Sequence, residues 1–110
     1  MKLPYRNNSY VPRKKLTDYL LSETHPVGRL KAKFFTSIGF DLTNVTKLEQ
    51  SLLNIAYDQD IKEVIPSQYG KKYIIDGKLQ SPAGNTIRIR TVWILEKEKK
   101  RPRFITAYPI

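Results

Sequence analysis

The sequence contains no cysteine, only one histidine, and no apolar run long enough to span a membrane. Without cysteine, the chain has no disulfide framework and no thiolate to serve as nucleophile or metal ligand. With one histidine, a metal ion would have to be held largely by carboxylates. The first residues also lack the apolar stretch of a secretory signal. We therefore expect a protein that acts in the cytoplasm, without a membrane partner.

Glycine-rich and acidic motifs are missing too. The five glycines form neither a phosphate-binding loop nor a dinucleotide-binding fingerprint. The nearest approach to the site of a metal-dependent nuclease is Asp76 with Glu98 and Lys100, but Glu98 belongs to a charged run that we expect to be exposed. The sequence therefore predicts neither a metal site nor a nucleotide cofactor.

Positive charge is what the chain has in excess. Twenty Lys and Arg residues against ten Asp and Glu give a formal charge of +10 at pH 7 and a pI near 9.9. A polyanion relieves the resulting self-repulsion, because neutralising its phosphates releases counterions. A length of 110 residues, with 40% hydrophobic and 27% charged residues, is typical of one globular domain. We therefore predict a single domain, residues 1–110, that binds nucleic acid.

Hydrophobic periodicity predicts helices first and strands afterwards. Residues 1–10 are expected to be an extended lead-in, residues 11–57 a helical part and residues 61–108 an antiparallel sheet. One helix is predicted within each of the segments 11–22, 27–40 and 43–57, and the predicted strands span residues 61–65, 72–79, 86–95 and 104–108. This order predicts an α+β fold in which N-terminal helices pack on a four-stranded antiparallel sheet.

The second predicted helix combines an apolar stripe with a group of cations. The stripe expected to face the core consists of Leu30, Phe34, Phe35 and Ile38, and Gly39 is expected just after the helix end. Cations occupy positions 29, 31 and 33 within about two helical turns of the helix start. A phosphate at that end would meet free N–H groups as well as these cations.

The only histidine, His25, precedes Pro26 at the start of this helix. Histidine changes charge near neutral pH without help from its surroundings, so His25 is a candidate for proton transfer. Its alternative role is to hydrogen-bond the turn before Pro26. We predict Lys31 to be the main phosphate contact, with Lys33 second, and Arg29 to bind RNA from the surrounding surface.

A second group of polar side chains lies on the last two predicted strands. Arg88 and Arg90 share one side of a strand whose other side is apolar, and Thr106 and Tyr108 share one side of the final strand. Antiparallel pairing of Arg90 with residues 106–108 would bring guanidinium, hydroxyl and phenol onto one sheet face. Arginine suits a bidentate hold on phosphate. The alternative is an exposed, solvated face.

The connection between these strands carries a third cationic group. Its cations are Lys97, Lys99, Lys100, Arg101 and Arg103. We expect a solvated hairpin tip that attracts RNA through its field and adds affinity without specificity. On the preceding strand, Trp93 lies on the apolar side and is predicted to be core rather than a platform for base stacking.

Four segments resemble known proteins. They are His25-Pro26-Val27-Gly28, Lys31-Ala32-Lys33-Phe34-Phe35, Ile89-Arg90-Thr91-Val92-Trp93 and Ile105-Thr106-Ala107-Tyr108-Pro109. Together they resemble a family of small bacterial domains of unknown function, found as stand-alone proteins and as tips of polymorphic toxins. The chain also resembles members of a wider superfold, which includes barnase, the colicin D and E5 nucleases, RelE-type toxins and contact-dependent inhibition toxins. That superfold implies a metal-independent endoribonuclease with helices preceding an antiparallel sheet.

In several contact-dependent toxins, a histidine and a basic residue from the helical part join a Thr-x-Tyr pair on a late strand. Carried over by position, this pattern falls on His25, Lys31, Thr106 and Tyr108, with Arg90 as a further phosphate contact. Lys31 stands where such relatives often have arginine, so Lys33 or Arg90 are alternatives for its role. The resemblance also implies a small acidic antitoxin or immunity protein as partner.

The residues and the resemblance together predict a toxin-type endoribonuclease. Metal-free RNA cleavage needs a group that takes the 2′-OH proton, a group that protonates the leaving 5′ oxygen, and cations around the phosphate. His25 would act as base or acid, Lys31 and Arg90 would bind the phosphate, Tyr108 would transfer or orient a proton, and Thr106 would position oxygens. The alternatives are a non-catalytic nucleic-acid-binding module and an adaptor that docks an acidic protein.

Overall fold

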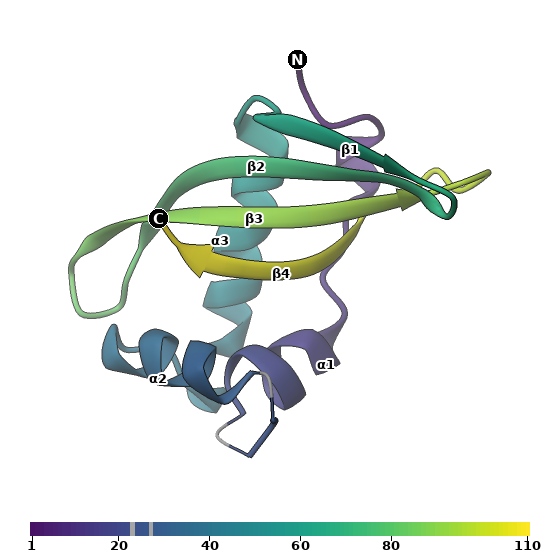
Figure 1. The fold of residues 1–110 in the computed structure, drawn as a ribbon. Helices are drawn as coiled ribbons and strands as arrows, with labels where there is room; N and C mark the ends of the chain where they lie inside the picture. Colours follow the sequence, from purple (N-terminus) through teal and green to yellow (C-terminus); the bar gives the residue numbers. More distant parts are fainter. Residues whose placement is uncertain (23, 27) are drawn as a thin grey trace.

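In the C-terminal half of the chain, apolar and polar residues alternate in several runs. These runs form the strands of an antiparallel meander. The strands are β1 (Glu63–Ser67), β2 (Gly70–Gln80), β3 (Thr86–Glu96) and β4 (Arg103–Pro109), and each pairs with the next in the order β1-β2-β3-β4 (Figure 1). This computed structural model describes residues 1–22, 24–26 and 28–110. The predicted α+β fold with a four-stranded antiparallel sheet is confirmed.

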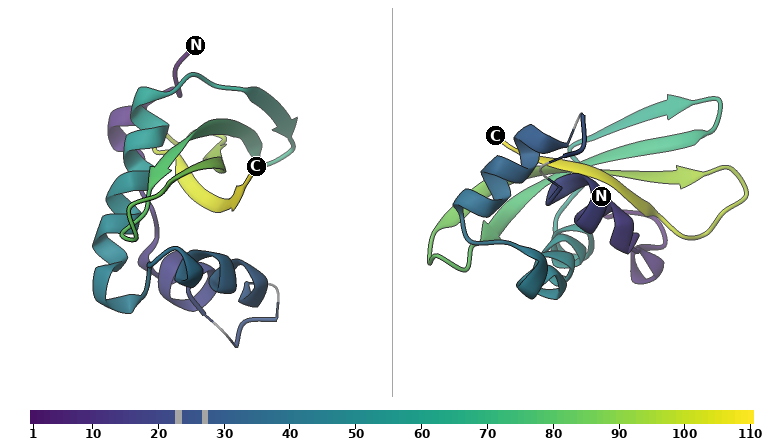
Figure 2. Two further views of the ribbon diagram at one scale, coloured as in Figure 1. Left: turned by 90° about the vertical axis from the view of Figure 1, so that its left-hand side faces the viewer. Right: turned by 90° about the horizontal axis from the view of Figure 1, so that it is seen from below.

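The core lies between one face of this sheet and helix α3 (Val45–Asp58). Trp93 of β3 is 0% exposed, as predicted for a core residue, and its ring packs edge-to-face on Phe104 of β4. Gly77 of β2 lets the helix approach closely, since a Cβ there would lie 2.9 Å from the side chain of Ile55. Figure 2 shows α3 running along the sheet, while the opposite sheet face stays open beside the shorter helices.

The shorter helices lie beyond the β4 side of the sheet (Figure 1). Helix α1 (Arg13–Lys15) continues directly into a five-residue π-helix, η2 (Leu16–Leu20), and helix α2 (Arg29–Ser37) follows. Gly39 has a φ of +103°, so it ends α2 as expected. Short 3-10 turns span Arg6–Asn8 in the expected lead-in and Leu42–Asn44 before α3. Glu23 and Val27, the latter assigned to the second predicted helix, lie outside the described residues.

The predicted apolar stripe of α2 is wrong at its first position, Leu30. Leu30 is 71% exposed, whereas Ala32, Phe35 and Ile38 are buried. At 3.6 residues per turn, Lys31 lies on the same side as Phe35 and therefore turns toward the sheet rather than toward solvent. Within the described part of the chain, no helix has the length and apolar character needed to cross a membrane.

Candidate functional site

Side chains from η2, α2 and β4 meet where the short helices reach the open face of the sheet. The Tyr19 hydroxyl lies 3.2 Å from the Thr106 Oγ1 atom, within hydrogen-bond distance. The Lys31 Nζ atom lies 5.6 Å from the centre of the Tyr19 ring and 6.0 Å from that of the Tyr108 ring. We call Tyr19, Lys31, Thr106 and Tyr108 the β4 corner. It brings two phenols, a hydroxyl and an ammonium group together.

A β-bulge in β4 turns the side chains of Thr106 and Tyr108 toward this corner. Arg90 pairs with Tyr108 and Val92 with Thr106, but the next pair is Trp93 with Phe104. The extra residue on β4 reverses the alternation of side chains at that point. Phe104 is therefore buried in the core, while Thr106 and Tyr108 point to the open face. The predicted pairing of Arg90 with the 106–108 segment is confirmed.

Tyr19 is the member of the corner that was not predicted from the sequence. Together with Leu16 and Leu20 it has the spacing of an apolar helix face, and no local feature of the sequence indicates that β4 lies opposite. In the structure it belongs to the π-helix η2, a rare form frequent at functional sites. Partial burial raises the pKa of the Tyr19 phenol, but the hydrogen bond with Thr106 and the charge of Lys31 outweigh it, so the pKa falls below its ordinary value.

His25 caps the start of α2 and borders the corner. Its Nδ1 atom accepts a hydrogen bond of 2.9 Å from the Gly28 backbone N–H, and its carbonyl accepts one of 3.1 Å from the Arg29 N–H. The side chain therefore does what Ser, Asp or Asn does at other helix starts. Its ring meets the Tyr19 ring edge-to-face at 5.2 Å. The structure thus shows the turn role of His25, and a part in proton transfer stays a prediction.

Gly28 holds α2 tightly against η2, because a Cβ there would lie 2.3 Å from the Tyr19 carbonyl oxygen. Its φ of −79° suits any residue, so contact rather than backbone conformation requires glycine. We expect Gly28→Ala to push α2 away and to lower the free energy of unfolding by roughly 1–3 kcal/mol, as overpacking does. Urea denaturation measures this. An unchanged unfolding curve would mean that α2 and η2 are not held by this contact.

Arg90 does not point at an empty space for phosphate but is paired with a carboxylate. Its Nε and Nη2 atoms donate to Asp76 at 2.8 and 2.9 Å, across the β2–β3 pair. These hydrogen bonds lower the pKa of Asp76 and raise the pKa of Arg90, which also interacts with Tyr108. This ion pair was not predicted from the sequence. Arg90 lies opposite Tyr108 in the β3–β4 pairing, so the ion pair is next to the β4 corner.

The stability of this ion pair should depend on pH. Because the pKa of Asp76 is lowered in the folded protein, the pair stabilises the fold above the ordinary pKa of 3.8 and loses that contribution as pH falls through the lowered value. We expect Asp76→Asn to melt at a lower temperature than wild type at neutral pH, and the two melting temperatures to converge in strong acid. Circular dichroism melts across this range test it; a constant difference would contradict the assignment.

The remaining predicted cations are not members of the β4 corner. Arg29 and Lys33 are exposed on the outer side of α2, and Arg88 is exposed on β3. Exposed cations at the β3–β4 turn are Lys97, Lys99, Lys100 and Arg101, the last of which packs on the Tyr10 ring at 3.9 Å. The structure thus gathers only part of the predicted RNA-binding set near the corner.

A hollow of about 390 Å³ borders the β4 corner. Its lining residues are Pro12, Lys14, Lys15, Asp18, Tyr19, His25 and Arg103. Arg103 also forms an ion pair of 3.3 Å with Glu96. Because cations outnumber the single carboxylate of this lining, the hollow favours an anionic group beside Tyr19.

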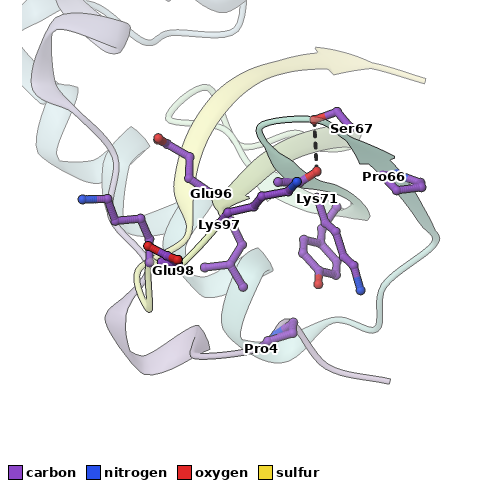
Figure 3. A pocket seen from close by; sticks show the side chains of 11 residues that line it. Pro4, Pro66, Ser67, Lys71, Glu96, Lys97 and Glu98 are labelled. Atoms are coloured by element: carbon purple, nitrogen blue, oxygen red, sulfur yellow. Dashed lines mark hydrogen bonds between the residues drawn. The ribbon is translucent and has the colours of Figure 1, made fainter.

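Another hollow, of about 360 Å³, lies at the opposite end of the sheet, where the β1–β2 and β3–β4 turns meet (Figure 3). Pro4, Pro66 and Lys71 are among its lining residues, and Ser67 closes the neighbouring turn by donating to the Gly70 carbonyl at 3.0 Å. No residue of the β4 corner lines it. Among the described residues, no three His, Cys, Asp or Glu side chains gather as metal ligands would, and Asp76, Glu98 and Lys100 stay apart as members of a strand and a turn.

The fold has a counterpart among solved structures. A chain of the contact-dependent growth inhibition toxin–immunity protein complex from Klebsiella pneumoniae 342 matches with a TM-score of 0.73 and 23% sequence identity, covering 96% of each chain. This likeness concerns the fold, and the finer resemblance to barnase and RelE stays a prediction. No curated protein is similar in sequence. A match over residues 2–110 shows that the chain belongs to the family described as "Domain of unknown function (DUF6883)".

Proposed function

We propose that this protein is a metal-independent endoribonuclease of the toxin type. The observation that carries the proposal is the β4 corner, in which phenol, hydroxyl and ammonium groups converge beside a cationic hollow. Cleavage by the RNA's own 2′-OH needs proton transfer and charge stabilisation at phosphorus. These side chains can supply both without a metal ion. DNA has no 2′-OH to attack, so the proposed substrate is RNA.

In this reaction, Lys31 stabilises the negative charge that develops on the phosphate, and Thr106 orients an oxygen. Tyr108 transfers or orients a proton, with Arg90 beside it. The cations of the β3–β4 turn and the outer side of α2 attract RNA without choosing a sequence. Because the proposed substrate is RNA, the cytoplasm is the proposed place of action.

The structural neighbour comes from a complex of two kinds of protein, a toxin and an immunity protein. A charge of +10 and the β4 corner support the toxin role for this chain. By the same reasoning, its partner would be a small acidic protein that covers the cationic surface. Charge complementarity of this kind speeds association and selects partners.

Growth of bacteria that express the chain tests the proposal. We expect arrested growth and fragmented RNA with the wild type, and normal growth with a variant whose Tyr108 is replaced by phenylalanine. Loss of the phenol hydroxyl leaves the ring and the fold in place. Normal growth with the wild type, together with salt-sensitive RNA binding by the purified protein, would instead favour the non-catalytic binding module. Comparable amounts of soluble protein serve as the control.

A further inference from the structure

We infer that Tyr19 is the general base of the β4 corner and that His25 is a positioning residue that holds α2 against it. The inference rests on the proposed function and assigns the proton-transfer step within it. Tyr19 is placed for this role by contacts from three directions. Its hydroxyl meets Thr106 of β4, its ring meets the His25 ring edge-to-face, and two lysines lie over the ring.

The surroundings of Tyr19 favour a phenolate. The Nζ atoms of Lys15 and Lys31 lie 5.1 and 5.6 Å from its ring centre, on different helical segments. Charged or titratable groups around Tyr19 are Lys14 and Lys15 of α1, Asp18 of η2, His25, Lys31 of α2, and Arg103 and Tyr108 of β4. Cations predominate among them. Partial burial raises the pKa of Tyr19, but the hydrogen bond with Thr106 and the charges of Lys31 and Lys15 lower it below its ordinary value.

His25 is occupied in a way that disfavours proton transfer through Nδ1. That atom accepts the Gly28 N–H, so its lone pair is engaged and cannot take a proton while this hydrogen bond stands. Protonation of Nδ1 would replace this hydrogen bond with two opposed N–H groups and weaken the start of α2. Since α2 carries Lys31, the cap fixes where the lysine stands relative to Tyr19. His25 thus acts through the position of other residues.

The proposed step is cleavage of RNA by attack of its own 2′-OH. The Tyr19 phenolate takes the proton as the 2′-O–H bond breaks, and the 2′ oxygen forms a bond to phosphorus. The bond between phosphorus and the 5′ oxygen breaks, and the Tyr108 phenol gives its proton to that oxygen. The products are a 2′,3′-cyclic phosphate and a 5′-hydroxyl end. Proton exchange with water then restores both tyrosines.

A change of leaving group separates the base from the acid. The substrates are an oligoribonucleotide containing a mapped cleavage site and the same oligomer with sulfur in place of the bridging 5′ oxygen, since a thiolate leaves without being protonated. We expect Tyr19→Phe to lower the rate at least about 100-fold on both substrates. Tyr108→Phe should cleave the oxygen substrate much more slowly than wild type does, and the sulfur substrate at nearly the wild-type rate. Tyr69→Phe, at a tyrosine 69% exposed in the β1–β2 turn, is the matched control and should cleave as wild type does.

Two further readouts test the assignment. The wild-type kcat/KM should rise with pH on its acidic limb as Tyr19 loses its proton, and Tyr19→Phe should lack that rise. His25→Asn keeps an acceptor for the Gly28 N–H and should retain most of the wild-type rate. His25→Ala offers no acceptor to the Gly28 N–H, so its cleavage rate and its melting temperature should both be lower than those of wild type.

Three results would overturn the inference. They are a Tyr19→Phe rate equal to that of Tyr69→Phe, recovery of Tyr19→Phe on the sulfur substrate, and loss of cleavage in a folded His25→Asn variant. The last would mean that the imidazole itself takes part. Failure of the wild type to cleave any RNA would overturn the proposed function, whereas these three outcomes overturn only the roles of Tyr19 and His25.

Discussion

Replacing Lys31 by methionine is expected to lower the rate of RNA cleavage by at least about 100-fold, the order of effect seen when one donor to a developing charge is removed. Lys31 lies between the Tyr19 and Tyr108 rings, so its ammonium group is the cation within the β4 corner. Methionine keeps a stem of similar length that still packs on those rings. Single-turnover cleavage with saturating protein measures the chemical step apart from RNA affinity.

Lys33→Met is the matched control for this prediction. Both changes remove one positive charge from α2, but Lys33 is exposed on its outer side. The control should weaken RNA binding in a salt-dependent way and leave the single-turnover rate near that of wild type. Equal losses in the two variants would mean that the charge of α2 attracts RNA as a whole and that Lys31 has no special place. A larger loss with Lys33→Met would move the site to the outer side of the helix.

Trp93→Ala is expected to lower the free energy of unfolding by about 3–5 kcal/mol, a large part of the roughly 5–15 kcal/mol that holds a domain together. Trp93 is fully buried, and its Nε1–H donates to Thr91 Oγ1 at 2.8 Å. That hydroxyl donates in turn to the Ile75 carbonyl at 2.7 Å. The change leaves a cavity between sheet and α3 and removes one link of this chain. Urea denaturation of the purified variant gives the value.

Trp93 also lies next to the β-bulge that orients Thr106 and Tyr108. We therefore expect Trp93→Ala to displace these side chains and to lower the cleavage rate. Trp93→Phe separates the two effects, since it keeps an aromatic ring against Phe104 but has no N–H for Thr91. We expect a smaller loss of stability from it and cleavage close to wild type. A loss below about 1 kcal/mol in Trp93→Ala would contradict the central place given to this side chain in the core.

The order of elements was predictable because each segment carries its own period. The third helix repeats apolar residues at helical spacing, and the strand around Trp93 alternates them. The antiparallel pairing of Arg90 with residues 106–108, which the order of the strands suggested, is also the pairing in the structure. The α2 stripe was predicted less well at Leu30, because a helix with apolar residues on more than one side does not reveal which side meets the sheet.

The parts of the site that sequence could not supply depend on long-range contacts. Tyr19 and Thr106 are 87 positions apart and meet only when η2 lies beside β4. The bulge that separates Phe104 from Thr106 changes the face of a strand without any glycine to signal it. The Asp76–Arg90 ion pair needs the β2–β3 register. Local propensity therefore predicts the elements, and tertiary packing decides which polar side chains become neighbours.

Incubation of the purified protein with total RNA in the presence of EDTA, followed by analysis of the new RNA ends, tests the central claim most directly. Metal-free attack by the 2′-OH predicts fragments that end in 2′,3′-cyclic phosphate and begin with a 5′-hydroxyl, with Lys31→Met nearly inactive. Intact RNA under these conditions, or fragments with 3′-hydroxyl and 5′-phosphate ends formed only when a divalent metal is supplied, would contradict it.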